Sequence, residues 1–162
     1  VYDPAKYGTH GRYKNVAAFD FSGLYPAMIL ARNISWETLT SEKTEFAVNV
    51  SIPRDFGEVQ KNRMVYYKTD KLGILPQAVQ ELKTLRDDYK LKMREAKSDE
   101  EYNKWYNNQM AVKRLMASFY GIIAYQGFGW SNVILAASIT ASAREAIREA
   151  AFKVMDIGEE EE

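Results

Sequence analysis

The chain has 162 residues, and its 22 Lys+Arg balance 22 Asp+Glu, so no global basic field favours coating of nucleic acid or of an anionic membrane. The absence of cysteine excludes disulfides, thiolate zinc sites and cysteine nucleophiles, and one histidine, His10, argues against imidazole zinc sites and serine triads. We expect no membrane span, because no apolar stretch approaches the roughly 20 residues that a span requires. We expect no secretion signal, because the chain does not open with a charged segment followed by an apolar one.

The residue pattern in the first half of the chain predicts a strand, then a helix, then a pair of strands. Residues 15–21 (NVAAFDF) alternate as a short strand does and end in the turn Ser22–Gly23. Residues 24–32 have apolar side chains at helical spacing, with Pro26 in the first turn, where a missing N–H costs nothing. Alternation over 45–51 and 64–69 predicts two paired strands.

The residue pattern in the second half predicts three helices, with a short aromatic strand and turn before the third. From Pro76 onward, apolar residues recur at spacings of three and four, as on one face of a helix. Ser98–Glu101 has a capping-box pattern, which predicts a turn and a second helix that ends at Gly121. An aromatic strand and turn within 120–130 and a third long helix over 132–155 follow. This order favours an α+β fold in which two long helices form an antiparallel hairpin.

Asp20 is the first candidate functional residue. On the predicted strand it shares the face of Val16 and Ala18, where a carboxylate is costly unless it is paired or metal-bound. The backbone amides of residues 23–25 begin a helix and can bind an anion. A carboxylate beside such amides suits a complex of Mg²⁺ with a triphosphate. With no cysteine and one histidine in the chain, any metal ion would be bound by oxygen atoms, which Mg²⁺ prefers. Spacing alone nevertheless favours a solvated acid, because a single Asp before a turn is common.

A cationic stripe marks the first long helix. Its members are spaced by three and four residues, so they share one face beside the apolar stripe: Lys83, Arg86, Lys90, Arg94 and Lys97. Spacing alone again favours a solvated face that merely covers the edge of the core. An antiparallel hairpin, however, can bring Lys113 of the next helix near the level of Arg86 and Lys90, which favours anion binding.

Two segments resemble motifs of the family B, or α-like, DNA polymerases. Residues 20–29 (DFSGLYPAMI) resemble motif A, D-x-x-S-L-Y-P-S-I-I, with Gly23 and Ala27 in place of two serines. Residues 113–121 (KRLMASFYG) resemble motif B, K-x-x-x-N-S-x-Y-G, with Ala117 in place of asparagine. The two motifs have the expected order and interval, and the resemblance covers nearly the whole chain and suits an archaeal-type member best.

The resemblance to motif A implies the chemistry of the first site. Asp20 would be catalytic and would bind both Mg²⁺ ions of a two-metal site, and the carbonyl of Phe21 would bind one of them. The amides around Gly23, Leu24 and Tyr25 would hold the triphosphate of a dNTP. The Tyr25 ring would lie under the incoming sugar.

The resemblance to motif B implies how the hairpin acts. Arg86, Lys90 and Lys113 would grip the triphosphate, with Lys113 also stabilising charge during catalysis. Gln109 would lie near the nucleotide. Three further residues would lie near the nascent base pair and the DNA: Ser118, Tyr120 and Gly121.

The resemblance also implies an architecture. The expected α+β fold is a partial palm, a small antiparallel sheet with packed helices, joined to a fingers subdomain made of the helical hairpin. Residues 1–73 would be the first part of the palm, 74–121 the fingers and 122–162 the second part of the palm. We expect the family's D-T-D motif, its thumb and its exonuclease domain to lie outside this sequence.

The implied function is template-directed addition of dNTPs to a primer 3′ end in DNA replication or repair, with the isolated chain inactive. The expected partners are primer–template DNA, dNTP and the remaining polymerase portion in cis or as a separate subunit, without a membrane. The expected location is cytoplasmic and nucleoid-associated in a prokaryote, or nuclear in a eukaryote. Two alternatives are a non-catalytic DNA/nucleotide-binding module and a structural scaffold. The intact set of Asp20, Tyr25 and Lys113 favours the enzyme.

Overall fold

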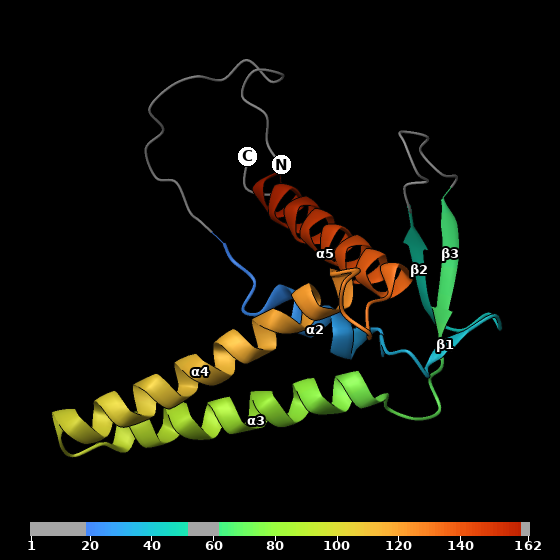
Figure 1. Ribbon diagram of the computed structural model, residues 1–162. Coiled ribbons are helices and arrows are strands. Elements are labelled where there is room, and N and C mark those ends of the chain that lie inside the picture. Colours follow the sequence, from blue (N-terminus) through green and yellow to red (C-terminus); the bar gives the residue numbers. More distant parts are fainter. Residues whose placement is uncertain (1–18, 52–61, 160–162) are drawn as a thin grey trace.

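Three short strands form an antiparallel sheet in the computed structural model, which describes residues 19–51 and 62–159 (Figure 1). The strands are β1 (Leu39–Thr40), β2 (Phe46–Val50) and β3 (Arg63–Tyr67), and β3 lies in the middle. The register pairs Val48 with Val65 and Phe46 with Tyr67. Because alternate residues share one face, the buried members of β2 and β3 point into the same core. The predicted strand pair is confirmed.

Helix α5 (Val133–Glu159) packs against the sheet through β2, and helix α2 (Leu24–Ala31) packs against α5. The side chain of Asn132 begins α5, because its Oδ1 accepts hydrogen bonds from the amides of Ile134 (2.9 Å) and Leu135 (3.1 Å). Small buried residues of α5 let the neighbouring elements approach closely: Ala136, Ser138, Ala141, Ser142 and Ala143.

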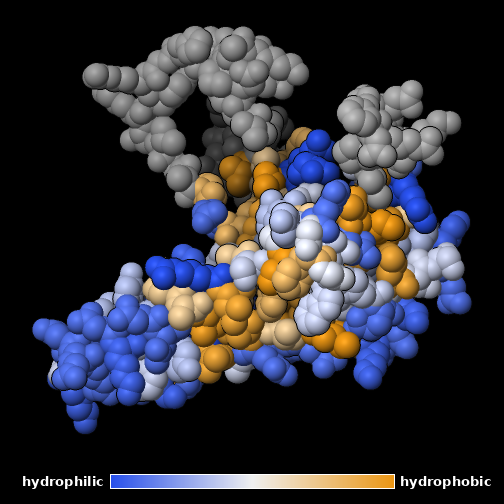
Figure 2. Space-filling model, in the orientation of Figure 1, coloured by the Kyte–Doolittle hydropathy of each residue, from blue (hydrophilic) through white to orange (hydrophobic). Residues whose placement is uncertain are grey.

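Two long helices extend from this body as an antiparallel hairpin (Figure 1). They are α3 (Ile74–Glu95) and α4 (Asp99–Ala124), and Ser98 caps α4 by accepting a hydrogen bond from the Glu101 amide at 3.2 Å. The Glu101 carboxylate accepts one from the Lys97 amide at 3.0 Å, so the capping pattern is confirmed. The outer end of the hairpin is hydrophilic, and apolar side chains gather where it meets the body (Figure 2).

Asn33 ties the base of the hairpin to the end of α2. Its Nδ2 donates hydrogen bonds to the carbonyls of Lys68 (2.7 Å) and Lys71 (2.9 Å), and its Oδ1 accepts one from the Gly73 amide at 2.8 Å. Asn33 has a φ of 51°, a conformation that asparagine adopts more readily than most residues. At Gly73 a Cβ would lie 2.6 Å from the Cβ of Ser35, so glycine permits this close approach.

Glu37 adds a second link at the start of α3. Burial by itself raises the pKa of its carboxyl group. Hydrogen bonds from the Ser35 hydroxyl and the Ile74 amide, with the charge of Lys71, outweigh burial and lower that pKa below its ordinary value. The folded state therefore favours the charged carboxylate at the N-terminus of α3, where the helix dipole also favours negative charge.

Two predictions were wrong, and a third lies mostly outside the described residues. Helix α4 continues through Gly121 to Ala124, and no strand forms within the aromatic segment, which turns over 125–131. The reason is tertiary: Ile123 is 1% exposed, and its burial outweighs the roughly 1 kcal/mol that glycine costs within a helix. The predicted strand over 15–21 lies mostly outside the described residues, and Phe19–Phe21 pair with no strand among those described.

No helix in the ranges 19–51 and 62–159 combines the length and the apolar character needed to cross a membrane.

Candidate functional site

A small cavity lies where the start of α2 meets the middle of α3. Its volume is about 100 Å³. Ser22 and Gly23 line it before α2, and the helix α3 contributes a row of three cations: Lys83, Arg86 and Lys90. The cavity therefore joins the predicted motif A turn to the predicted cationic stripe, two features that are far apart in the sequence.

Gly23 shapes the entrance of α2. It is the N-cap with φ 69° and ψ 53°, a left-handed conformation that glycine adopts without the steric cost that a Cβ imposes. No side chain caps this helix, and its first hydrogen bond runs from the Ala27 amide to the Gly23 carbonyl at 2.9 Å. The amides of Leu24 and Tyr25 precede that bond and so have no partner within the helix. Amides of this kind can donate to an anion, so anion binding here stays a prediction.

Arg86 is held in place by the second helix of the hairpin. Its Nε donates to Oε1 of Gln109 at 3.3 Å, and Gln109 is only 6% exposed. A buried amide that accepts this bond fixes the direction of the guanidinium group and leaves its other donors for a ligand. Gln109 therefore positions Arg86.

Lys90 shares the cavity with an acid. Its Nζ lies 3.2 Å from Oδ1 of Asp87, one turn away on α3, and both residues line the cavity. This ion pair offsets part of the positive charge that an anionic ligand would meet. Lys83 and Arg86 line the same cavity and add to its positive character.

Motifs A and B meet at a pair of aromatic rings. Tyr25 of α2 and Tyr120 of α4 have ring centroids 4.8 Å apart and an interplanar angle of 47°. Both rings are partly buried and pack against the core. The first turn of α2 and the end of α4 thus form one surface beside the cavity.

The remaining predicted site residues lie around this centre. Asp20 and Phe21 are exposed and precede α2. Lys113 is exposed on α4, one turn beyond Gln109 and closer to the body; it does not line the cavity. The hydroxyl of Ser118 donates to the carbonyl of Leu115 at 2.7 Å within α4, and Gly121 is exposed.

Lys83 was not predicted as a site residue. It lines the cavity beside Arg86, although the sequence placed it only in the cationic stripe. The signal that identifies it is its helical spacing to Arg86 and Lys90, combined with the position of the stripe against α2.

Asp20, which precedes α2, is the carboxylate that the sequence predicts as a metal ligand. Within 19–51 and 62–159 no group of three or more His, Cys, Asp or Glu side chains is placed to hold a metal. Mg²⁺ is commonly bound by one or two carboxylates together with the phosphates of a substrate. Asp20 therefore suits Mg²⁺ shared with a nucleotide, and it does not suit a metal site built by these residues alone.

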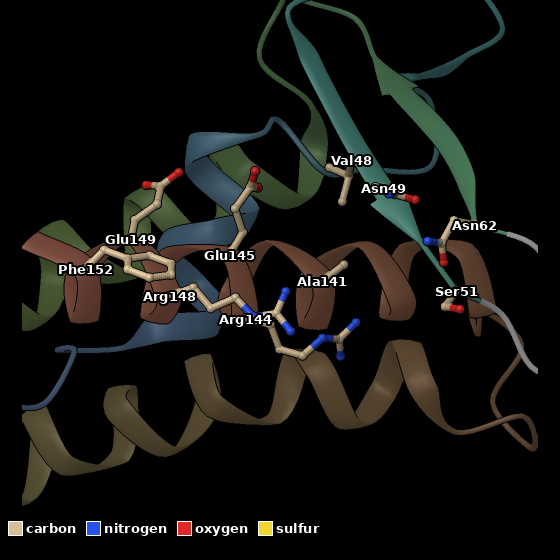
Figure 3. A pocket seen from close by; sticks show the side chains of 10 residues that line it. All are labelled: Val48, Asn49, Ser51, Asn62, Ala141, Arg144, Glu145, Arg148, Glu149 and Phe152. Carbon is tan, nitrogen blue, oxygen red and sulfur yellow. The ribbon is translucent and has the colours of Figure 1, made fainter. Parts of the chain in front are cut away.

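A second cavity, of about 390 Å³, lies between β2 and the middle of α5 (Figure 3). Arg144 and Arg148 extend to one side of α5, and Glu145 and Glu149 extend to the other. Glu145 forms an ion pair with Arg32 at 2.9 Å. None of the predicted site residues lines this cavity.

Comparison with known proteins decides the family. The family described as DNA polymerase family B matches residues 4–161. The chain belongs to this family. A DNA polymerase of Paramecium bursaria Chlorella virus NY2A is 32% identical to it over 94% of the chain, and a DNA polymerase of Pyrococcus glycovorans is 30% identical over 85%. The DNA polymerase delta catalytic subunit of Arabidopsis thaliana is 27% identical over 88% of the chain.

The family B match extends to the fold. The structure of the family B DNA polymerase from Pyrobaculum calidifontis matches 86% of this chain with a TM-score of 0.66 at 23% identity. The chain spans 17% of the viral polymerase, 16% of the Pyrococcus polymerase and 18% of the Pyrobaculum chain. The α+β fold expected from the sequence is thereby confirmed.

Proposed function

We propose that this chain is the nucleotide-binding part of a template-directed DNA polymerase, and that the cavity between α2 and α3 holds the triphosphate of a dNTP. The observation that carries the proposal is that the uncapped start of α2 and three cations of α3 line one cavity. Membership of DNA polymerase family B supports the same assignment.

The size and charge of the cavity suit phosphate groups. Pockets that enclose whole small-molecule ligands measure about 300–1,000 Å³, so about 100 Å³ accommodates phosphates and leaves a sugar and base outside. Backbone amides and a guanidinium group offer charge-assisted hydrogen bonds to phosphate oxygens. The sugar would lie against Tyr25, and Tyr120 beside it would face the nascent base pair with Ser118 and Gly121 nearby.

Lys113 would contact the nucleotide from the other helix of the hairpin. Arg86 lies opposite Gln109, and antiparallel helices advance in opposite directions. Lys113, four residues beyond Gln109, therefore lies near the level of Lys83. From there its long side chain would reach phosphate oxygens that extend beyond the cavity and would stabilise their charge during reaction.

Asp20 and the carbonyl of Phe21 would hold Mg²⁺ together with the nucleotide phosphates. When bound, Mg²⁺ neutralises phosphate charge and orients the reacting groups. The chain's own residues orient the triphosphate: the amides of Leu24 and Tyr25 from α2, and Arg86, fixed by Gln109, from α3.

The proposed domain assignment follows the family. Residues 1–73 form the first part of the palm, 74–121 the fingers and 122–162 the second part of the palm, although α4 runs on to Ala124. The proposed partners are primer–template DNA, dNTP and the remaining polymerase portion. A non-catalytic nucleotide-binding module is the second candidate, because no group of three or more metal-binding side chains occurs in the part of the chain that the structure describes.

Calorimetric titration with dATP and Mg²⁺ tests the site. We expect Arg86→Ala and Lys90→Ala each to weaken binding by about tenfold or more, because hydrogen bonds to charged groups contribute about 1.5–3 kcal/mol. Arg114→Ala is the control, since Arg114 is exposed on α4 and does not line the cavity. Equal weakening by all three substitutions would contradict the assignment.

Asp87→Asn offers a test in the opposite direction. The substitution removes the carboxylate that pairs with Lys90 and also faces the cavity. We expect dATP to bind about two- to fivefold more tightly, because exposed ion pairs contribute about 0.2–1 kcal/mol. A triphosphate site elsewhere in the chain would not respond to this change.

A further inference from the structure

The cationic row of α3 continues beyond the cavity toward the outer end of the hairpin. Arg86 and Lys90 line the cavity, and Arg94 follows one turn after Lys90 on the same side of the helix. Arg94 is exposed, and it forms no ion pair with any described residue. Glu95 follows it in sequence, but it points to another side of α3 because successive helical residues differ by about 100°.

A row of aromatic residues lies beside these cations on α4. Tyr106 and Tyr102 precede Gln109 at spacings of three and four, so they share its side of the helix. The hydrogen bond between Gln109 and Arg86 places that side of α4 next to the cationic side of α3. In antiparallel register, Tyr106 lies near the level of Lys90, and Tyr102 lies near the level of Arg94.

The two tyrosine rings are exposed and parallel. Tyr102 is 45% exposed and Tyr106 is 42% exposed, and their ring centroids lie 6.4 Å apart with an interplanar angle of 11°. They are not needed to join the helices, because a different pair does so: the rings of Tyr89 and Trp105 stack across the hairpin at 5.7 Å. The hairpin thus has an internal aromatic pair that packs and an external pair that faces solvent.

We propose that Arg94, Tyr102 and Tyr106, here called the outer track, bind single-stranded DNA. Surfaces that bind single strands combine cations along the backbone with aromatic faces on which successive bases stack. The outer track has both, and its charge is complementary to phosphate. Three acids, Asp99, Glu100 and Glu101, form the first turn of α4 next to Tyr102 and weaken the local field, so stacking carries much of the affinity.

The outer track also adjoins the proposed triphosphate cavity through Lys90. If the proposed function holds, the bound strand is the unpaired template ahead of the incoming nucleotide. Binding of a single strand needs neither nucleotide nor metal, so it can be measured apart from the proposed function.

Fluorescence anisotropy with a fluorescein-labelled ten-nucleotide oligothymidine, without Mg²⁺ or dNTP, tests the outer track. We expect the double variant Tyr102→Ala/Tyr106→Ala to bind about tenfold or more weakly, because base–aromatic stacking is strong in such complexes. Tyr102→Phe/Tyr106→Phe keeps both rings and should bind as the unchanged chain does. Circular dichroism checks that each variant retains its helices.

Charge is tested separately. Arg94→Ala should weaken binding and lower the slope of log K against log salt by about 0.7, the value for one lost phosphate contact with a single strand. Arg114→Ala, an exposed arginine on another side of α4, should change neither. A blunt 10-bp duplex should bind more weakly than the single strand, because its bases are already stacked.

Three results would overturn the proposal: unchanged binding after both rings are removed, equal loss with the phenylalanine pair, or equal affinity for duplex and single strand. The dATP titration above is unaffected by these outcomes. Failure of the triphosphate site and failure of the outer track are therefore distinguishable.

Discussion

Tyr67 shows how burial changes one titratable group. The residue is fully buried on β3, and its hydroxyl donates to Oγ of Ser138 at 2.7 Å, which in turn donates to the carbonyl of Ile134 at 2.8 Å. Burial raises the pKa of Tyr67 to about 12, from an ordinary value of 10.0, although the hydrogen bond to Ser138 opposes the change. The neutral hydroxyl is therefore part of the link between sheet and helix α5.

We expect the chain to lose stability between pH 10 and about pH 12. In that range the unfolded state releases the Tyr67 proton and the folded state keeps it, so unfolding becomes more favourable by roughly 2–3 kcal/mol over the full range. Tyr67→Phe should cost about 1 kcal/mol at neutral pH and remove this part of the pH dependence. Urea unfolding at pH 8–11, followed by circular dichroism, measures both effects.

Tyr66→Phe is the matched control for that experiment. Tyr66 lies on the same strand and is less buried than Tyr67. The control variant should lose stability with rising pH as the unchanged chain does. Parallel pH curves for the unchanged chain and Tyr67→Phe would contradict the assignment of this dependence to Tyr67.

Local chemistry explains which elements could be predicted from the sequence. Capping by Ser98, the turn at Gly23 and the alternation in β2 and β3 depend on neighbouring residues, so their patterns identify the elements. The continuation of α4 past Gly121 depends on burial of Ile123 against residues distant in sequence, which a local pattern does not contain. The same limit applies to the candidate site.

The cavity is a tertiary feature that combines two predictable parts. The sequence predicted the cationic stripe and the amides of α2, but not that Lys83 faces them or that Asp87 shares the cavity. It also did not indicate Asn33, whose three hydrogen bonds reach residues more than thirty positions away in the chain. Such contacts are specified only when the helices and strands have packed.

Asn33→Asp should weaken the attachment of the hairpin to the end of α2, although Asn33 does not itself line the cavity. A carboxylate cannot donate to the carbonyls of Lys68 and Lys71, and at neutral pH it would place negative charge beside both oxygens. We expect a loss of at least about 2 kcal/mol in the free energy of unfolding, since stranded buried polar groups cost about 1–3 kcal/mol each. Urea unfolding measures this loss, and dATP titration should show weaker binding because α3 is less well anchored.

Asn103→Asp is the control for charge alone, because Asn103 is exposed on α4. It should change the free energy of unfolding by less than about 0.5 kcal/mol. A comparably small effect of Asn33→Asp would mean that the three hydrogen bonds of Asn33 do not hold the hairpin.

The zero net charge of the chain conceals a separation of charges between its parts. Cations gather on the side of the hairpin that faces α2, whereas α4 begins with three acids: Asp99, Glu100 and Glu101. Local fields of this kind act over about 10 Å at moderate salt, so the cavity can attract a triphosphate although the whole chain is neutral. Binding of nucleotide should accordingly weaken as salt is raised.

We expect the 162-residue chain to bind dNTP but not to extend a primer by itself. Two-metal phosphoryl transfer places cations about 3.5–4 Å apart, which requires carboxylates from more than one element. Within the described residues Asp20 is the one acid that the proposed site employs, and no group of three metal-binding side chains occurs there. A single carboxylate leaves most of the Mg²⁺ coordination to water and phosphate, so the primer oxygen would not be activated.

Primer extension should appear when the remaining polymerase portion is added in trans. Asp20→Ala should abolish this restored extension. Asp70→Asn, which changes an exposed acid after β3, should leave it intact. Robust extension by the purified chain alone would show instead that other residues join Asp20 to complete a metal site within the chain.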